Sequence, residues 1–299
     1  MDMYLASVLT NMTLIAFLAL SAYLVLVVGE VSFGQQAFFG IGAYITASAT
    51  ALAGAHIFWG LLAGAIGGAS CALLLGLLTI RLSGIYFAIS TLCFAELLRF
   101  FLLHLRFTQS VDGRIIGPDG PEGFSNIRWV FENHYQVTDF LLLAVTCLII
   151  LLIVLFSLER SPIMLGARMV GNDPILAQSQ GLNPTRYRLS FITLSGAVAG
   201  FGGGLFALFN THIEPAMFGV MLGIHGLAYA VIGGLGSAVG PLMGVFLDIG
   251  LLESIRPLAA YRMIIFGGLV AFLLVFRPEG IISPRLVSRL KSRWRNRHV

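Results

Sequence analysis

The sequence predicts an all-α membrane protein, a polytopic transmembrane helix bundle of about 8–10 spans with some broken or re-entrant glycine-rich segments. Of its 299 residues, 58% are hydrophobic and only 11% are charged, and the mean hydropathy is +0.91. Residues 31–80 carry no charged side chain, which leaves enough chain for two spans of about 20 residues each. Soluble domains do not have this composition, so a single transmembrane domain is expected over residues 1–299.

Nine apolar elements follow one another along the chain. Their expected ranges are 3–28, 32–55, 58–80, 84–105, 140–156, 189–210, 220–232, 241–252 and 260–276. The N-terminal segment has Asp2 but no basic residue, so a cleaved signal peptide is not expected and the first element is interpreted as a retained span. The stretch GPDGPEG (117–123) ends helices and favours turns, which makes 106–139 a long polar loop.

The positions of lysine and arginine predict the orientation of the bundle. The tail 285–299 holds six basic residues and no acid, and the loop 158–188 adds four arginines. Basic residues gather on the cytoplasmic side of membrane proteins, so both segments are expected there. The loop 106–139 has three arginines against five acids and is expected outside. One apolar element, 140–156, separates the two loops, which agrees with their lying on opposite faces.

The loop 158–188 contains the turn chemistry of a short, isolated helix. Asp173 followed by Pro174 is typical of an N-cap and a first helical residue. Gly181 is typical of the glycine that ends a helix, and Asn183 before a second proline is typical of the cap of the next one. The pattern predicts a helix of about two turns at 174–180.

This short helix would expose Ile175, Leu176 and, just beyond its end, Leu182. An isolated helix of this length does not persist in water, so it needs a surface to dock into. A groove on a partner protein is the favoured interpretation, because the segment lacks the strong separation of apolar and charged faces that is typical of a helix lying on a bilayer. The bilayer surface is the alternative.

Glycine recurs at every fourth position in three of the elements. The series are Gly60, Gly64 and Gly68; Gly196, Gly200 and Gly204; and Gly236, Gly240 and Gly244. Each series would give one helix face without side chains, and such faces allow close contact between spans. The glycine spacing therefore predicts a tightly packed bundle.

Polar side chains within the apolar elements are candidates for lining a transport path. Glu96 and Arg99 share a helix face, so they are either functional intramembrane charges or a self-neutralised structural pair. Gln35 and Gln36 lie in a glycine-rich element, where polar side chains line a path or bond between helices. Weaker candidates of the same kind are Tyr44, Tyr86, Ser90 and Thr91.

The sequence argues against enzymatic, metal and nucleotide chemistry in this chain. The three cysteines lie in apolar runs without CxxC spacing, and the six histidines show no HExxH or paired spacing. The single lysine, Lys291, does not follow a glycine, so the chain has no GxxxxGK[ST] phosphate loop. We therefore expect no cofactor, no metal and no nucleic acid. If ATP drives the protein, another chain binds it.

Five segments, taken in order, resemble one protein family. They are VVGEVSFGQQAFFGIGAYITA (27–47), RLSGIYFAISTLCFAELLR (81–99), ARMVGNDPILAQSQGLNPTRYRLSFITLSGAVAGFGGGLFA (167–207), VIGGLGSAVGPLMG (231–244) and FRPEGI (276–281). This order is similar to that in bacterial branched-chain amino acid ABC transporter permeases, and it most resembles the second of their two permease paralogues.

The resemblance implies a multi-pass subunit of the bacterial inner (plasma) membrane that forms a translocation path with a paralogous permease. It also implies two cytoplasmic ATPase subunits and an external solute-binding protein as partners. The segment 173–183 resembles the ATPase-docking segment of that family. We therefore predict a permease subunit of an ATP-driven importer, and not an enzyme.

Two positions depart from the family pattern. Pro174 stands where an acidic residue is common, which leaves Asp173 as the nearby acid. The outer loop has TQSVDG (108–113) in place of a more glycine-rich run, and this leaves the substrate open, because relatives handle urea, amides and other small organic acids as well as leucine, isoleucine and valine. The rival interpretations are an autonomous secondary transporter or channel, which would show more buried charges along its path, and an intramembrane enzyme.

Overall fold

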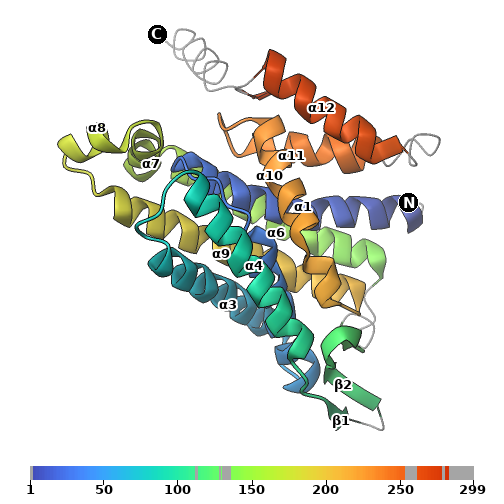
Figure 1. Cartoon of the computed structure of the whole chain (residues 1–299). Coiled ribbons are helices and arrows are strands. Elements are labelled where there is room, and N and C mark those ends of the chain that lie inside the picture. The colour runs from blue at the N-terminus through green and yellow to red at the C-terminus, as the bar shows by residue number, and fades with distance from the viewer. Residues whose placement is uncertain are drawn as a thin grey trace.

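The fold is a bundle of helices with one small sheet at its edge, as a computed structural model shows for residues 3–111, 114–127, 129, 136–252, 261–277 and 280–282 (Figure 1). The helices are α1 (Met3–Val27), α2 (Gln35–Ala47), α3 (Ile57–Leu78), α4 (Ile85–His104), α6 (Val137–Glu159), α7 (Pro162–Asn172), α8 (Pro174–Ser179), α9 (Pro184–Asn210), α10 (Val220–Gly233), α11 (Val239–Val245) and α12 (Arg262–Phe276). Two π-helical segments, Ser48–Leu52 and Phe246–Leu252, continue α2 and α11.

Five of the described helices are long and apolar enough to cross a membrane: α1, α3, α4, α6 and α9. The helices α10, α11 and α12 are apolar but shorter, and α2 is interrupted by its π-helical end. Each of the nine predicted apolar elements overlaps one of the described helices. The prediction of an all-α, polytopic membrane protein with some short glycine-rich segments is thus confirmed.

Glycines let α9 approach α2 and α3 at backbone distance. A Cβ atom added at Gly68 would collide with the carbonyl oxygen of Gly196, and one added at Gly200 would collide with that of Gly64. Similar additions at Gly60 and Gly204 would meet the side chains of threonines on α2 and its π-helical extension. The first two glycine series therefore lie where helices touch, as close packing of spans requires.

The third glycine series divides between a turn and a helix. Gly240 and Gly244 lie on α11 and pack against the backbone of α10, whereas Gly236 lies in the turn between the two helices. The expected helical face from Gly236 onward is wrong, because the chain reverses direction at Gly234, where φ is +93°. This positive φ is not helical and favours glycine, so α10 ends before Gly236.

The loop 106–139 holds a small antiparallel sheet that the sequence analysis did not predict. Strand β1 (Gln109–Val111) pairs with β2 (Arg114–Pro118), and β2 pairs with β3 (Phe124–Ser125). Phe124 also bridges to Ile213, so the sheet is tied to the link between α9 and α10. The strands have two to five residues, too few for an alternating pattern to be visible in the sequence.

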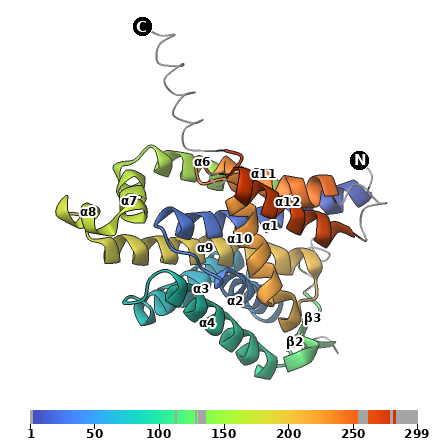
Figure 2. The same ribbon diagram turned by 45° about the horizontal axis from the view of Figure 1, so that its top comes forward.

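The two polar regions lie at opposite ends of the bundle. Helices α7 and α8 project from one end, and the sheet lies at the other end in both views (Figures 1 and 2). Helix α6 runs from the sheet end to α7. The segment 285–299, predicted to be a cytoplasmic tail, lies outside the described residues.

Candidate functional site

The short helix α8 carries the caps that its sequence predicts. The Oδ1 atom of Asp173 accepts hydrogen bonds from the backbone N–H groups of Ile175 and Leu176, at 2.9 and 3.0 Å. At the other end Gly181 has a φ of +82°, and the Oδ1 atom of Asn183 caps α9 by accepting from the N–H of Arg186 at 3.2 Å. Both ends of α8 are therefore fixed by local chemistry and not by packing alone.

The outer face of α8 is apolar and uncovered. The side chain of Ile175 is 80% exposed and that of Leu176 is 57% exposed, while Ala177 faces inward and is buried. An open hollow of about 630 Å³ lies beside this face, between α8 and the beginning of α9. Its lining includes Gln178 and Leu182. The segment thus presents a protruding apolar edge with a hollow at its side.

A second helix precedes α8, and the sequence analysis missed it. Pro162 is the first residue of α7, and Ser161 is its N-cap. The side-chain oxygen of Ser161 accepts from the N–H of Met164 at 3.4 Å. Ser-Pro before an apolar stripe is a helix-start signal of the same kind as Asp173-Pro174. One side of α7 buries Met164 and Val170, so α8 follows a packed helix. We call α7 and α8 together the docking unit, after the role that is proposed for α8 below.

Charged side chains join the docking unit to the bundle. Arg168 on α7 donates to the carbonyl oxygen of Gly236 at 3.0 Å and to the hydroxyl of Tyr23 at 3.4 Å. The same hydroxyl donates to Glu159, the last residue of α6, at 2.9 Å. Glu159 also accepts from the N–H of Ala238 at 2.6 Å. Helices α1, α6 and α7 and the turn before α11 therefore meet at this junction.

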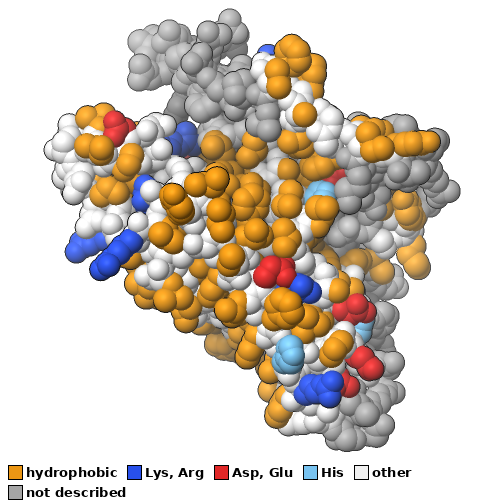
Figure 3. Space-filling model, viewed as in Figure 1, with side chains coloured by type: hydrophobic (Ala, Val, Ile, Leu, Met, Phe, Trp, Pro, Cys, Tyr) orange, Lys and Arg blue, Asp and Glu red, His pale blue; other side chains and the backbone are white. Residues whose placement is uncertain are grey.

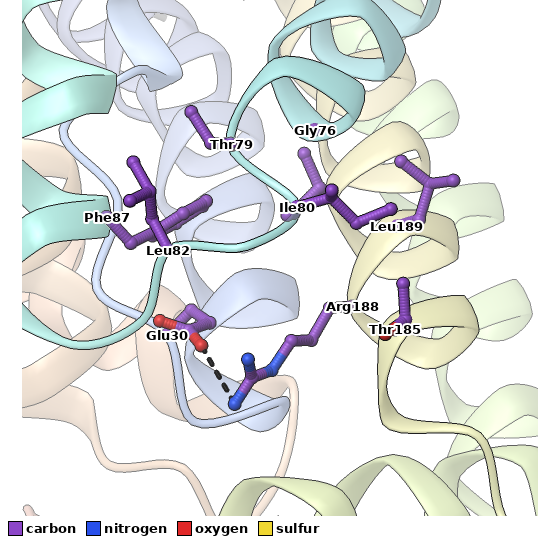
Figure 4. Close-up of a pocket in the computed structure, with 10 residues that line it drawn as sticks. Glu30, Gly76, Thr79, Ile80, Leu82, Phe87, Thr185, Arg188 and Leu189 are labelled. Carbon is purple, nitrogen blue, oxygen red and sulfur yellow. Dashed lines mark ion pairs between the residues drawn. The ribbon is translucent and has the colours of Figure 1, made fainter.

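A second charged contact lies beside a small cavity (Figure 4). Arg188, near the start of α9, forms an ion pair with Glu30 at 3.1 Å, and Glu30 is only 2% exposed. Its other carboxylate oxygen accepts from the N–H of Gly84 at 3.2 Å. Burial raises the pKa of the Glu30 carboxyl above its usual value, and Arg188 and the Gly84 N–H offset part of this rise. The adjoining cavity has about 10 Å³, too little for a substrate.

The two adjacent glutamines at the start of α2 are fully buried but have different surroundings. The Oε1 atom of Gln35 accepts from the hydroxyls of Ser21 and Ser195, at 3.3 and 2.9 Å. Both amide atoms of Gln36 lack a hydrogen-bond partner among the described residues. Gln36 lies against Gly223 of α10, where an added Cβ would collide with it. Gln35 thus joins three helices through its oxygen, while its Nε2 atom and both amide atoms of Gln36 have no partner among the described residues.

The weaker candidates differ in how far they are buried in the bundle. Tyr44 is 4% exposed, and its ring stands edge-on to Phe124 and Phe218. Thr91 is buried and accepts from the N–H of Phe33 at 3.0 Å, so it links α4 to the segment before α2. Tyr86 is 71% exposed. The hydroxyl of Ser90 donates to the carbonyl oxygen of Tyr86 at 2.8 Å.

The predicted pair on α4 is present. The Nε and Nη2 atoms of Arg99 each lie 2.8 Å from one carboxylate oxygen of Glu96, and about a quarter of each side chain is exposed. The face that α4 crosses is largely hydrophobic, with an acidic and a basic side chain side by side within it (Figure 3). The structure therefore brings these two residues to each other but not to Gln35 or Gln36.

Several polar contacts escaped the sequence analysis because their partners are far apart in the chain. Glu30 and Glu159 each stand at the end of an apolar element, where a charge has the usual meaning of a membrane boundary. Asp248, buried at 1%, accepts from the hydroxyl of Tyr229 at 2.6 Å inside the π-helical segment. No group of histidine, cysteine, aspartate or glutamate that could hold a metal ion occurs in the described part of the chain.

The family model and the similar proteins that match this chain carry the same description. The family model described as branched-chain amino acid transport system / permease component matches residues 4–276. The chain is 31% identical over 271 residues to the high-affinity branched-chain amino acid transport system permease protein LivM of Salmonella typhimurium, and 32% identical over 280 residues to LivM of Escherichia coli. Each alignment covers 85% of this chain and 64% of the relative, so the chain spans less than two thirds of the length of these proteins.

A further relative is the probable branched-chain amino acid transport permease protein LivH of Methanocaldococcus jannaschii. It is 33% identical over 138 residues, which are 44% of this chain and 43% of the relative. No solved structure matches the chain. The family model covers most of the chain in one continuous match, and this confirms the predicted family: the chain belongs to the branched-chain amino acid permeases.

Proposed function

We propose that the chain is the permease subunit of an ATP-driven importer for branched-chain amino acids or related small polar solutes. It forms the translocation path together with a paralogous permease chain in the bacterial inner membrane. Two cytoplasmic ATPase subunits and an external solute-binding protein complete the importer. Family membership and the names of the LivM relatives support the permease role and the class of solute.

The observation that carries the proposal is the uncovered apolar edge of α8. The Asp173 cap fixes the start of α8, and Ile175 and Leu176 are exposed on its surface. A groove on another protein would bury these two side chains. Full burial of each side chain contributes about 1.5–3 kcal/mol. The chain has no phosphate loop, so the ATPase subunit is the natural protein to provide that groove.

The proposed orientation puts the docking unit in the cytoplasm and the sheet outside. The four arginines of the loop 158–188 support it, as does the separation of the two regions in Figures 1 and 2. In a cysteine-free background, an impermeant thiol reagent added outside is expected to label a cysteine at Glu122 and to miss one at Gln178; both positions are exposed. Labelling in the reverse pattern would overturn the orientation.

Docking is tested by two substitutions in the purified importer. Leu176→Asp puts a charge on the apolar edge, and Gly181→Val strains a backbone whose φ is +82°. We expect each to release the ATPase or to uncouple hydrolysis from uptake, while the permease still inserts into the membrane. Retained ATPase and solute-stimulated hydrolysis are the measurements.

Matched controls separate docking from general damage. Asn172→Asp adds a charge next to α8 without removing an apolar side chain. Gly181→Asn introduces a residue that tolerates the left-handed conformation. Both controls are expected to keep the ATPase bound. If Leu176→Asp and Gly181→Val keep both the bound ATPase and the solute-stimulated hydrolysis at the unmutated level, α8 is a surface connection and not a docking helix. Uptake by the chain without any ATPase would instead support an autonomous transporter.

The path within this chain is proposed to follow α2 and the inner side of α4. The unpaired amide of Gln36, the buried Gln35 and the hydroxyl of Tyr44 support this course, because buried polar groups without partners are costly unless they meet water or a solute. Thr91 lies on the side of α4 that contacts the segment before α2, and Glu96 and Arg99 follow further along the same helix. Tyr86 and Ser90 would complete the path where the paralogous chain closes it.

A further inference from the structure

The segment between α1 and α2, residues 28–34, is held from two sides by the docking unit and by the helix that follows it. Gly171, close to the end of α7, packs backbone to backbone on Gly29, where φ is +79° and an added Cβ would collide with the carbonyl of Gly171. Arg188, near the start of α9, holds Glu30 by the ion pair at 3.1 Å. The two flanks of α8 therefore contact neighbouring residues of one linker.

The same linker holds the beginning of two helices on the proposed path. Glu30 accepts from the N–H of Gly84, which caps α4, and the N–H of Phe33 donates to Thr91 on α4 at 3.0 Å. Two residues after Phe33 the chain enters α2 at Gln35. A displacement of α7 and α8 thus has a continuous physical route to α2 and α4 through residues 28–34.

The ion pair between Glu30 and Arg188 is the charged contact on this route. Glu30 is 2% exposed, and in Figure 4 its carboxylate and the Arg188 guanidinium point toward one another between the α4 side and the α9 side of the cavity. A buried carboxylate that loses its cation is strongly unfavourable, so the two groups move together or not at all. The Nε atom of Arg188 has no hydrogen-bond partner among the described residues, which makes Glu30 the anchor of this guanidinium.

We propose that Glu30 and Arg188 are positioning residues that transmit displacement of the docking unit to α2 and α4. This rests on the proposed function, because the displacement originates in the ATPase. Neither residue touches the solute; each acts through the linker that sets where the two helices begin. We call the Glu30–Arg188 pair the joint. It couples the end of α7 and the start of α9 to the beginnings of α2 and α4.

The test uses the complete importer in vesicles, with labelled leucine as the solute. Glu30→Gln keeps an acceptor for the Gly84 N–H but removes the charge, and Arg188→Gln removes the cation. We expect each to lower the leucine imported per ATP hydrolysed by about tenfold, within the usual range of coupling between sites, with the ATPase still bound. The control is Asp119→Asn, the same chemical change in an exposed pair with Arg106 at 3.9 Å; its ratio is expected to stay unchanged.

The double variant Glu30→Gln with Arg188→Gln distinguishes a joint from a purely structural pair. Neutralising both partners removes the stranded charge, so the protein level and melting temperature are expected to recover while the import ratio stays low. Recovery of the ratio together with the level would overturn the proposal, as would an unchanged ratio in both single variants. If Leu176→Asp changes neither the bound ATPase nor the solute-stimulated hydrolysis, docking itself is overturned. If Leu176→Asp changes either one while the import ratio in Glu30→Gln stays unchanged, only the proposal for Glu30 and Arg188 is overturned.

Discussion

The inner and outer spans of this bundle differ in a way that hydropathy does not reveal. In their most apolar windows α1 and α9 are 78% and 72% buried, whereas α4 and α6 are 28% and 11% buried. The least buried span, α6, has the highest mean hydropathy of the five, at 3.2, and α9 has only 1.7. In a membrane, small residues and not large apolar ones bring helices together, because lipid is as apolar as leucine.

The contrast between α9 and α6 follows from their residues. Along α9 glycines face α2, α3 and α1, and backbone or side-chain atoms of these helices leave no room for a Cβ atom. Along α6 large side chains such as Ile150 and Ile153 are more than half exposed. The inner helices therefore form the fixed frame of the protein, and the outer helices offer their faces to lipid or to another chain.

The largest effect is expected where a methyl group is added between inner helices. In Gly200→Ala the new Cβ would collide with the carbonyl oxygen of Gly64, and overpacking of this kind costs about 1–3 kcal/mol. The matched control is Gly268→Ala on α12, where nothing lies within 4 Å and alanine favours the helix by up to about 1 kcal/mol. Thermal unfolding in detergent is expected to separate the two variants. Equal melting temperatures would contradict the distinction between frame and periphery.

Two carboxylates should show a related contrast, since Glu159 at the end of α6 bonds to α1 of the frame, whereas Glu96 on α4 pairs with Arg99 of its own helix. Glu159→Gln removes the charge that accepts from Tyr23, Ser237 and the Ala238 N–H, and hydrogen bonds to charged groups contribute about 1.5–3 kcal/mol. We expect this variant to lower the melting temperature and the amount of folded protein. Glu96→Gln, on the outer helix α4, is expected to keep the level and lower uptake if the residue lines the path.

The outcome for Glu96 has a clear alternative. If the pair with Arg99 is only structural, Glu96→Gln leaves a stranded cation and lowers the protein level, and the double variant with Arg99→Gln restores it. Normal level and normal uptake in the single variant would contradict both roles. A Glu159→Gln protein as stable as the unmutated one would show that the junction at α6 is not part of the frame.

Much of the fold could be predicted from the sequence because its signals are local. Long uncharged runs mark spans, and Asp173 with Gly181 marks α8 through side-chain and backbone preferences that act within a few residues. The ends of most helices lie close to the expected ranges for the same reason. The sheet near Phe124 could not be predicted, because its strands are too short to show a pattern and its bridge to Ile213 joins segments far apart in the chain.

The candidate site was predictable only in part, since its polar groups depend on tertiary contacts. Glu96 and Arg99 are three residues apart, and their pairing follows from helix geometry alone. Glu30 with Arg188 and Glu159 with Tyr23 are joined across the fold, and nothing in their local sequence indicates these partners. Gln35 and Gln36 are adjacent in the sequence, yet only the packing of α1, α9 and α10 makes the Oε1 atom of Gln35 bonded and that of Gln36 not.

The smallest effect is expected at Tyr44, one of two buried tyrosines of the inner helices whose hydroxyls have different partners. The hydroxyl of Tyr23 donates to Glu159 at 2.9 Å, and that of Tyr44 has no partner among the described residues. Tyr23→Phe should therefore cost about 1.5–3 kcal/mol, whereas Tyr44→Phe should leave the melting temperature unchanged or slightly raised, because an unpaired buried hydroxyl stabilises nothing. Uptake sharpens the comparison. A solute or water that passes along α2 would bond to the Tyr44 hydroxyl, so Tyr44→Phe is expected to change uptake without changing stability. A lowered melting temperature in Tyr44→Phe would mean that its hydroxyl has a structural partner and that α2 is frame alone at this point.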